Sequence, residues 1–80
     1  MNLDYIKSLC IDEEEVKWVV WAYTNHKKNS ECGKKFDVCF ISRNGNPYIQ
    51  YFDSNGIALG NPFPAVSAVD DNGLIYYETA

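Results

Sequence analysis

The chain has 80 residues, of which 46% are apolar, 15% aromatic and 22% charged, and its formal net charge is −4. So many apolar and aromatic side chains exclude a disordered segment, which combines low hydrophobicity with high net charge. The length predicts a single domain over residues 1–80, because half of this chain could not enclose a hydrophobic core.

The first segment, residues 2–10, has the apolar spacing of a short amphipathic helix. Leu3, Ile6 and Cys10 recur at intervals of three and four residues, and Leu9 widens the same stripe. A helix this short is stable only when it packs against another part of the protein. We therefore expect its apolar stripe to face the core.

The next segment, residues 12–28, carries signals for both a helix and a strand. Asp12 followed by Glu15 resembles a helix capping box, and the two lysines at the end would suit a helix C-terminus. In contrast, the stretch VKWVVWAYT at residues 16–24 consists almost wholly of β-branched and aromatic side chains, which favour strands. Wound as a helix, it would present apolar side chains on nearly every side. We predict a strand over residues 16–24, with a helix as the alternative.

The C-terminal half contains three Asn-Gly pairs between apolar runs, a strong signal for β-hairpins. The pairs are Asn44-Gly45, Asn55-Gly56 and Asn72-Gly73. A two-residue turn at the first pair would place Phe40 opposite Ile49 and Val38 opposite Tyr51. The core face of this hairpin is then predicted to hold Phe36, Val38, Phe40, Ile49 and Tyr51.

The remaining turns complete the predicted sheet. At residues 54–56 a three-residue loop with glycine in the left-handed conformation fits best. Residues 66–69 and 74–78 form a last hairpin, after Pro62 and Pro64 have interrupted the sheet. The predicted fold is α+β and mainly β, with a short N-terminal helix packed on a curled antiparallel meander sheet or small barrel of five to six strands.

Residues with catalytic or metal-binding chemistry do not form a recognisable pattern. Cys10, Cys32, Cys39 and His26 have the right chemistry for zinc, but the gaps between them are far longer than in sites built from neighbouring ligands. A nucleophilic pair of Cys39 and His26 is not indicated either, because Cys39 is predicted in the middle of a strand and His26 in a loop. Each glycine stands alone in a turn, so no phosphate-binding loop is present. We predict reduced thiols, no catalytic residue, no metal and no cofactor, and therefore a protein that is not an enzyme.

The balance of charge favours a protein partner over a nucleic acid. Eleven acidic residues outnumber seven basic ones, whereas nucleic-acid binders usually neutralise phosphates with an excess of Lys and Arg. No run of about 18 apolar residues occurs, and the first 11 residues lack a basic segment followed by an apolar one. We therefore predict a cytoplasmic protein without a membrane partner.

Acidic side chains and tyrosines are the best candidates for a functional surface. A compact acidic protein without catalytic residues is a common format for inhibitors of nucleic-acid-processing enzymes, because carboxylates can take the place of phosphates in a basic cleft. Tyr and Trp are frequent anchors at interfaces. The sequence predicts a protein-binding module, most simply an inhibitor of the phage anti-defence or immunity type. The predicted contact residues are Glu13, Glu14, Glu15, Asp70, Asp71, Tyr76 and Tyr77.

Two alternatives remain open at this point. The second face of the sheet, predicted to hold Cys39, Ile41, Tyr48 and Phe52, is half apolar and could join copies into a homo-oligomer. A small β-barrel could instead stack single-stranded nucleic acid on exposed aromatic side chains, with a lysine-rich stretch at residues 27–35 as the basic arm. The net charge argues against the second alternative.

Overall fold

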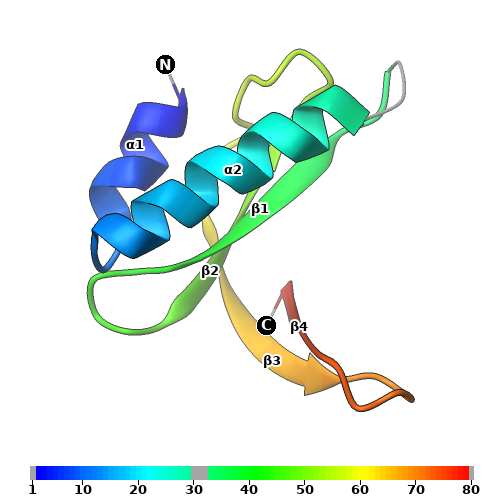
Figure 1. The fold of residues 1–80 in the computed structure, drawn as a ribbon. Helices are drawn as coiled ribbons and strands as arrows, with labels where there is room; N and C mark the ends of the chain where they lie inside the picture. Colours follow the sequence, from blue (N-terminus) through cyan, green and yellow to red (C-terminus); the bar gives the residue numbers. More distant parts are fainter. Residues whose placement is uncertain (1, 30–32, 80) are drawn as a thin grey trace.

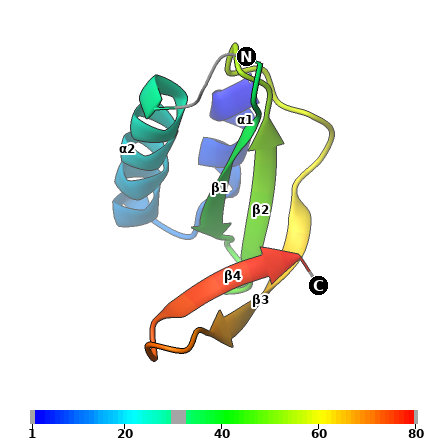
Figure 2. The same ribbon diagram turned by 90° about the vertical axis from the view of Figure 1, so that its right-hand side faces the viewer.

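In this computed structural model, residues 2–29 and 33–79 are described. The elements in chain order are α1 (Asn2–Leu9), α2 (Glu13–Asn29), β1 (Phe36–Ile41), β2 (Pro47–Phe52), β3 (Phe63–Val69) and β4 (Ile75–Thr79). The strands form one antiparallel sheet in the order β1-β2-β3-β4. Both helices lie on one side of β1 and β2, and the hairpin of β3 and β4 extends away from them (Figures 1 and 2).

This architecture confirms the predicted α+β class, with a helix packed on a curled antiparallel meander. The described part of the chain has four strands, fewer than the five to six predicted. The N-terminal helix is also confirmed, because α1 ends at Leu9 and its Ile6 side chain is fully buried in the core. Cys10, which follows α1, forms an isolated bridge with Ser42 and so ties the helix end to the β1–β2 turn.

The strand predicted over residues 16–24 is wrong, because this stretch lies inside α2. The capping residues outweigh the strand propensity of this stretch, since the Asp12 carboxylate accepts a hydrogen bond from the Glu15 N–H at 2.9 Å. Acidic residues in the first turn of α2 and basic residues in its last turn also complement the helix dipole. Only Val19 and Ala22 of this helix are fully buried. Its other apolar side chains, such as Trp18, Val20 and Trp21, point to other sides of the helix and stay partly exposed to solvent.

The register predicted for the first hairpin is wrong by one residue. The turn at residues 43–45 has three residues, with the Ser42 N–H donating to the Asn46 carbonyl at 2.9 Å and Gly45 at φ 85°. Phe40 is therefore opposite Tyr48, and Phe36 is opposite Phe52. One residue of slip exchanges the two faces of β2.

The slip changes which residues of β2 form the core. Tyr48, Gln50 and Phe52 face the helices, whereas Ile49 and Tyr51 lie on the opposite face with Cys39. The half-apolar second face predicted from Cys39, Ile41, Tyr48 and Phe52 therefore does not exist as one surface. Phe52 is fully buried and contributes to the core instead.

The three Asn-Gly turns share one main-chain hydrogen-bonding pattern, which explains the register. The N–H groups of Ser42, Asp53 and Asp70 each donate to the carbonyl four residues further on, and the glycine N–H of each turn donates back to the carbonyl of the first residue. In the second and third turns, the Asp53 and Asp70 carboxylates each accept main-chain N–H groups two and four residues further on, all at 2.9 Å. Each turn places its glycine at positive φ in the last loop position. The predicted three-residue loop at residues 54–56 and the last hairpin are thus confirmed. The predicted interruption of the sheet at Pro64 is wrong, because β3 begins at Phe63 and Pro64 lies opposite Tyr48.

Gly56 is required for a second reason. A Cβ atom at this position would collide with the Tyr23 hydroxyl, which donates a hydrogen bond to the Gly56 carbonyl at 3.0 Å. Tyr23 also packs edge-on against Phe52 and Phe36, with ring centroids 5.0 and 5.7 Å away. This contact fixes the second turn to the middle of α2.

The hairpin of β3 and β4 covers part of the sheet face that the helices leave bare. Ile49 points to that face, yet only 2% of it is exposed, and Ala65 of β3 is also buried. β4 contacts β2 although the two strands are not neighbours in the sheet. Between β2 and β3 only two residue pairs are in register, so the sheet bends sharply there.

The two edges of the sheet differ in how their main-chain groups are satisfied. On β1, the Ile41 N–H donates to a Glu15 carboxylate oxygen at 2.9 Å, and the Ile41 carbonyl accepts the Ile11 N–H at 3.0 Å. The Cys39 carbonyl accepts the Trp18 indole N–H at 3.1 Å. Side chains of α2 therefore protect the edge of β1 from pairing with another strand. No comparable cover lies along β4, whose five residues are all exposed.

This edge protection predicts different consequences for two adjacent glutamates. Replacing Glu15 by Ala removes a half-buried charged acceptor and should lower the free energy of unfolding by about 1–2 kcal/mol. Glu14→Ala is the matched control, because the Glu14 carboxylate is exposed and its ion pair with Lys17 at 3.6 Å lies on the surface. Urea unfolding followed by far-UV circular dichroism measures both. Equal midpoints for the two variants would contradict the assigned role of Glu15.

Candidate protein-binding surface

The outer side of α2 presents two exposed tryptophans in contact with each other. Trp18 and Trp21 stack with ring centroids 5.3 Å apart and an interplanar angle of 25°. Their exposed fractions are 46% and 57%. Exposed apolar rings of this size are uncommon on a soluble surface unless they contact a ligand or partner. The indole of Trp18 is also fixed by its hydrogen bond to β1, so the pair is held in place before any partner binds.

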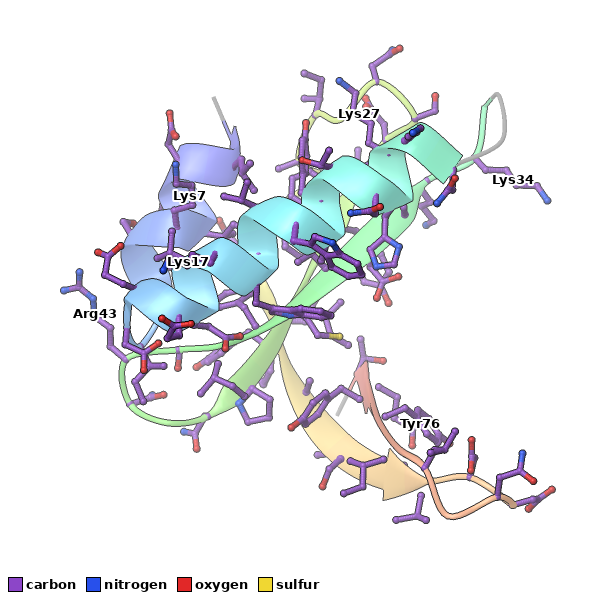
Figure 3. All side chains as sticks on the ribbon, in the orientation of Figure 1. Lys7, Lys17, Lys27, Lys34, Arg43 and Tyr76 are labelled. Atoms are coloured by element: carbon purple, nitrogen blue, oxygen red, sulfur yellow. The ribbon has the colours of Figure 1, made fainter. Side chains whose placement is uncertain are left out.

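The acidic run predicted as a contact surface divides into two parts. Glu13 and Glu14 are exposed in the first turn of α2, and Glu14 lies on the same side of the helix as Lys17 and the tryptophans. Figure 3 shows Lys17 projecting from this helix. Glu15 instead turns toward the sheet and binds the edge of β1. The structure therefore places Glu14 on the side of the aromatic pair, whereas Glu13 is exposed in the same first turn on a neighbouring side of the helix.

A shallow groove connects this helix face with β4. Its volume is about 270 Å³, and it lies between Trp18 and Tyr77, with Cys39 and Ile41 of β1 at its base. Tyr77 is thus near the tryptophan pair, as one border of the same recess. Tyr76 lies on the other face of the hairpin, in a position labelled in Figure 3.

The remaining predicted contact residues lie elsewhere. Asp70 and Asp71 lie at the tip of the β3–β4 hairpin, which points away from both helices (Figure 1). The Asp70 carboxylate is used within the turn, where it accepts two main-chain N–H groups. The structure therefore separates this pair from Glu13 and Glu14.

Sequence reasoning missed the tryptophan pair because residues 16–24 were assigned to a strand. On a strand, Trp18 and Trp21 would lie on opposite faces, whereas a helix brings residues three apart to the same side. The spacing of the two tryptophans was the available signal. This spacing indicates a pair on one face only if the segment is a helix, which the capping residues Asp12 and Glu15 indicate.

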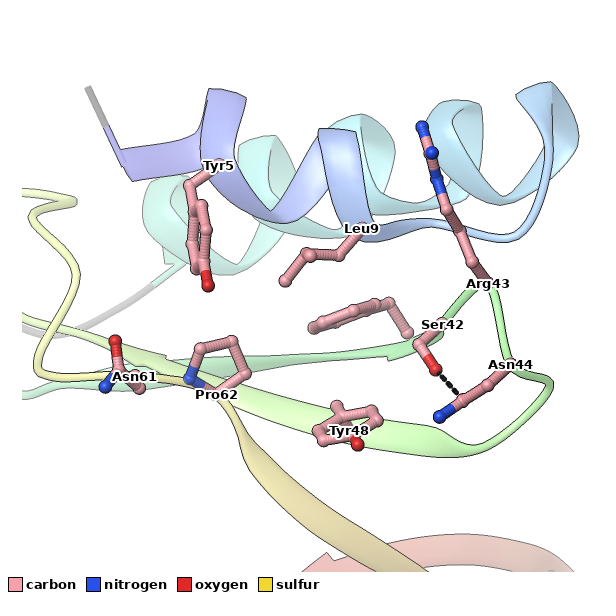
Figure 4. A pocket seen from close by; sticks show the side chains of 9 residues that line it. Tyr5, Leu9, Ser42, Arg43, Asn44, Tyr48, Asn61 and Pro62 are labelled. Carbon is pink, nitrogen blue, oxygen red and sulfur yellow. Dashed lines mark hydrogen bonds between the residues drawn. The ribbon is translucent and has the colours of Figure 1, made fainter.

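A larger recess lies between α1 and the β1–β2 turn (Figure 4). It has a volume of about 490 Å³ and a mainly apolar lining that includes Tyr5, Leu9 and Tyr48. Its polar groups do not converge on a ligand. The Ser42 hydroxyl bonds to the Asn44 side chain within the turn, and Arg43 points away from the recess floor. The Tyr5 hydroxyl points into the recess (Figure 4), but a built small-molecule site needs several polar groups that converge on the same point.

The thiols are held in their protonated form. Burial raises the pKa of the Cys39 thiol to about 11, and the carboxylate of Asp37 adds to this shift. Burial likewise raises the pKa of Cys10 to about 11, with further contributions from Glu15 and Asp12. Cys32, the third predicted thiol, lies outside the described residues. Within residues 2–29 and 33–79, no three side chains of the metal-binding types come together.

Comparisons with protein-family models, curated proteins and solved structures find no match to this chain. Neither α1 nor α2 has the length and apolar character that crossing a membrane requires.

The raised thiol pKa values predict slow alkylation in the native state. At pH 8 the thiolate fraction of Cys39 should be about 100-fold lower than that of an ordinary cysteine, because only the thiolate reacts. Peptide mapping after iodoacetamide treatment measures each site separately, and the chain unfolded in urea is the control. Alkylation of Cys39 at the same rate in both states would contradict the assignment. Because the folded pKa is raised, the contribution of Cys39 to stability should be complete below about pH 9 and lost as the pH approaches 11.

Proposed function

We propose that this protein is a non-enzymatic protein-binding module of the inhibitor type, which contacts its partner through the outer face of α2. The observation that supports this proposal is the stacked, exposed pair of Trp18 and Trp21. Few interface residues contribute most of the binding energy, and tryptophan is enriched among them. Two preorganised indoles on a rigid helix lose little conformational entropy on binding.

The charges around the pair suggest the chemistry of the partner. Glu13 and Glu14 lie at the start of the same helix, and the whole chain carries a net charge of −4. These carboxylates would attract a basic surface from a distance, such as the cleft of a nucleic-acid-processing enzyme. The indoles would then pack against that surface once the two proteins are in contact. The proposed partner surface therefore has an apolar pocket that takes the indoles and basic residues beside it that face the carboxylates.

Single-stranded nucleic acid is a second candidate, because exposed stacked indoles can also accept bases. Its phosphates would meet the two glutamates at the start of α2, which repel them. Lys35, from the lysine-rich stretch, is engaged elsewhere, with its ammonium 5.6 Å from the centre of the Tyr51 ring. These charges favour the protein partner, and nuclease treatment separates the two candidates experimentally.

The first test concerns the aromatic pair. Tagged protein and its Trp21→Ala variant are incubated with nuclease-treated host lysate, and retained proteins are identified by mass spectrometry. The variant should bind the retained partner at least tenfold more weakly, as measured by titration calorimetry with purified components. Trp21 is preferred to Trp18, whose indole also protects β1. A partner retained equally by the variant, or lost after nuclease treatment, would contradict the proposal.

The second test concerns the carboxylates and has a matched control within the chain. Reversing Glu13 and Glu14 to Lys should slow association about tenfold at low ionic strength and flatten its dependence on salt. Reversing Asp71 and Glu78 to Lys changes the net charge equally, but on the β3–β4 hairpin. Stopped-flow association rates measure both pairs. If the control slowed association as much as the helix variant, overall charge and not the α2 surface would be responsible.

A further inference from the structure

β4 is a free edge strand with its hydrogen-bonding groups available. The Asp70 N–H donates to the Leu74 carbonyl at 3.0 Å, so the main-chain groups of residue 74 point toward β3. Alternation along an antiparallel strand then directs the N–H and C=O groups of Ile75, Tyr77 and Thr79 to the outer edge. No partner for these groups occurs among the described residues, whereas the opposite edge of the sheet is covered by α2.

The side chains of this hairpin leave a large apolar surface in contact with solvent. Exposed fractions between 37% and 71% are found for Phe63, Val66, Val69, Leu74, Ile75, Tyr76 and Tyr77. Seven half-exposed side chains of this size offer on the order of 700 Å². A stable dimer buries about 800 Å² on each partner. Pairing along the edge of β4 covers only the part of this surface that lies on β4, namely Ile75, Tyr76 and Tyr77, so the main-chain hydrogen bonds contribute the larger share of such an interface.

We propose that β4 pairs with β4 of a second copy of this chain, antiparallel and about a two-fold axis at Tyr77. In this register Tyr77 is opposite its own equivalent, and Ile75 is opposite Thr79 of the other copy. Each copy directs three N–H groups and three C=O groups to its outer edge. In this register every one of them pairs with a group of the other copy, which gives six hydrogen bonds. Centring the axis on either neighbouring residue would form only four.

The charges fit the same register. Glu78 is the only charged residue of β4, and the axis at Tyr77 places it opposite Tyr76 of the other copy, where a phenol can donate to its carboxylate. The acidic turns at Asp70 and Asp71 then lie at opposite ends of the joined sheet. Like charges therefore do not face each other across the two-fold axis.

The proposal does not rest on the proposed function, because its hydrogen bonds come from β4 alone, although the Tyr77 side chain also borders the groove beside Trp18. Two copies would form one continuous eight-stranded sheet that carries two separate α2 surfaces. A second copy is favoured over an extended peptide because the edge is complementary to itself in hydrogen bonds, apolar contacts and charge. An extended segment from another protein would be the occupant only if the chain alone stays monomeric.

The test is the oligomeric state of the whole chain. Sedimentation equilibrium between about 10 µM and 1 mM should show the mass rising from 9.1 kDa toward twice that value. Dimerisation should strengthen with added salt, because two chains of charge −4 repel each other. A strictly monomeric chain throughout this range would overturn the proposal.

Two proline variants test the register. Tyr77→Pro removes the two central hydrogen bonds at once and should weaken dimerisation at least tenfold. Ser67→Pro is the matched control: Ser67 is directly opposite Tyr77, but its N–H points away from β4. This control should dimerise normally, as should Trp21→Ala, which separates the dimer from the partner surface on α2. A dimer unaffected by Tyr77→Pro, or abolished by Trp21→Ala, would place the interface elsewhere and overturn the proposal.

A measurement without substitutions protects this test against a misfolded variant. In a mixture of isotope-labelled and unlabelled wild-type chain, filtered nuclear Overhauser spectra should show contacts between the Tyr77 rings of different copies. Contacts between Ile75 and Thr79 of different copies should accompany them. Intermolecular contacts confined to α2 or α1 would overturn the proposed pairing.

Discussion

The packing of α2 across β1 and β2 is the constraint on which the rest of this structure depends. Val19 and Ala22 are the fully buried residues of the helix, and they meet the aromatic layer of Phe36, Phe40 and Phe52. A helix can bury only one stripe against a single sheet face. In a chain of 80 residues there is no second layer to cover the other sides. The exposed tryptophans are a direct consequence, since α2 carries more apolar residues than its buried stripe accommodates.

The same limit applies to the sheet. Both helices cover the same face of β1 and β2, and the opposite face is covered only where the β3–β4 hairpin curls back over Ile49. The outer part of that hairpin has no layer to pack against, so its apolar side chains stay in solvent. The molecule therefore has two apolar surfaces, one on a helix and one on a strand edge, which meet at the groove between Trp18 and Tyr77. Each results from a shortage of covering structure and not from a pocket shaped around a ligand.

The sequence predicted elements well where a local signal decides the structure. Helix α1, the three Asn-Gly turns and the last hairpin follow from spacing and turn residues that act within a few positions. The state of residues 16–24 could not be read from side-chain type, because strand propensity competed with capping residues and the outcome depended on tolerating exposed tryptophans. The register of the first hairpin depended on one residue of loop length, which Asn-Gly alone does not determine. The first misjudgement concerns tertiary packing and the second concerns the local turn type. The candidate surface was lost with the first, since only a helix brings Trp18 beside Trp21.

Trp18 contributes both to the covered sheet edge and to the exposed aromatic surface. Its indole N–H closes the edge of β1 while its ring supports Trp21 and borders the groove toward Tyr77. The protected edge is therefore built from a residue that also belongs to the exposed aromatic pair. A partner that covered the indoles would exclude water from the hydrogen bond to Cys39 and strengthen it, because a hydrogen bond is stronger in a medium of low dielectric constant. Contact with α2 would thus tighten the junction between helix and sheet, whereas pairing along β4 would leave that junction unchanged. The fold can accommodate both kinds of contact because side chains of α2 cover the edge of β1, whereas the edge of β4 is uncovered.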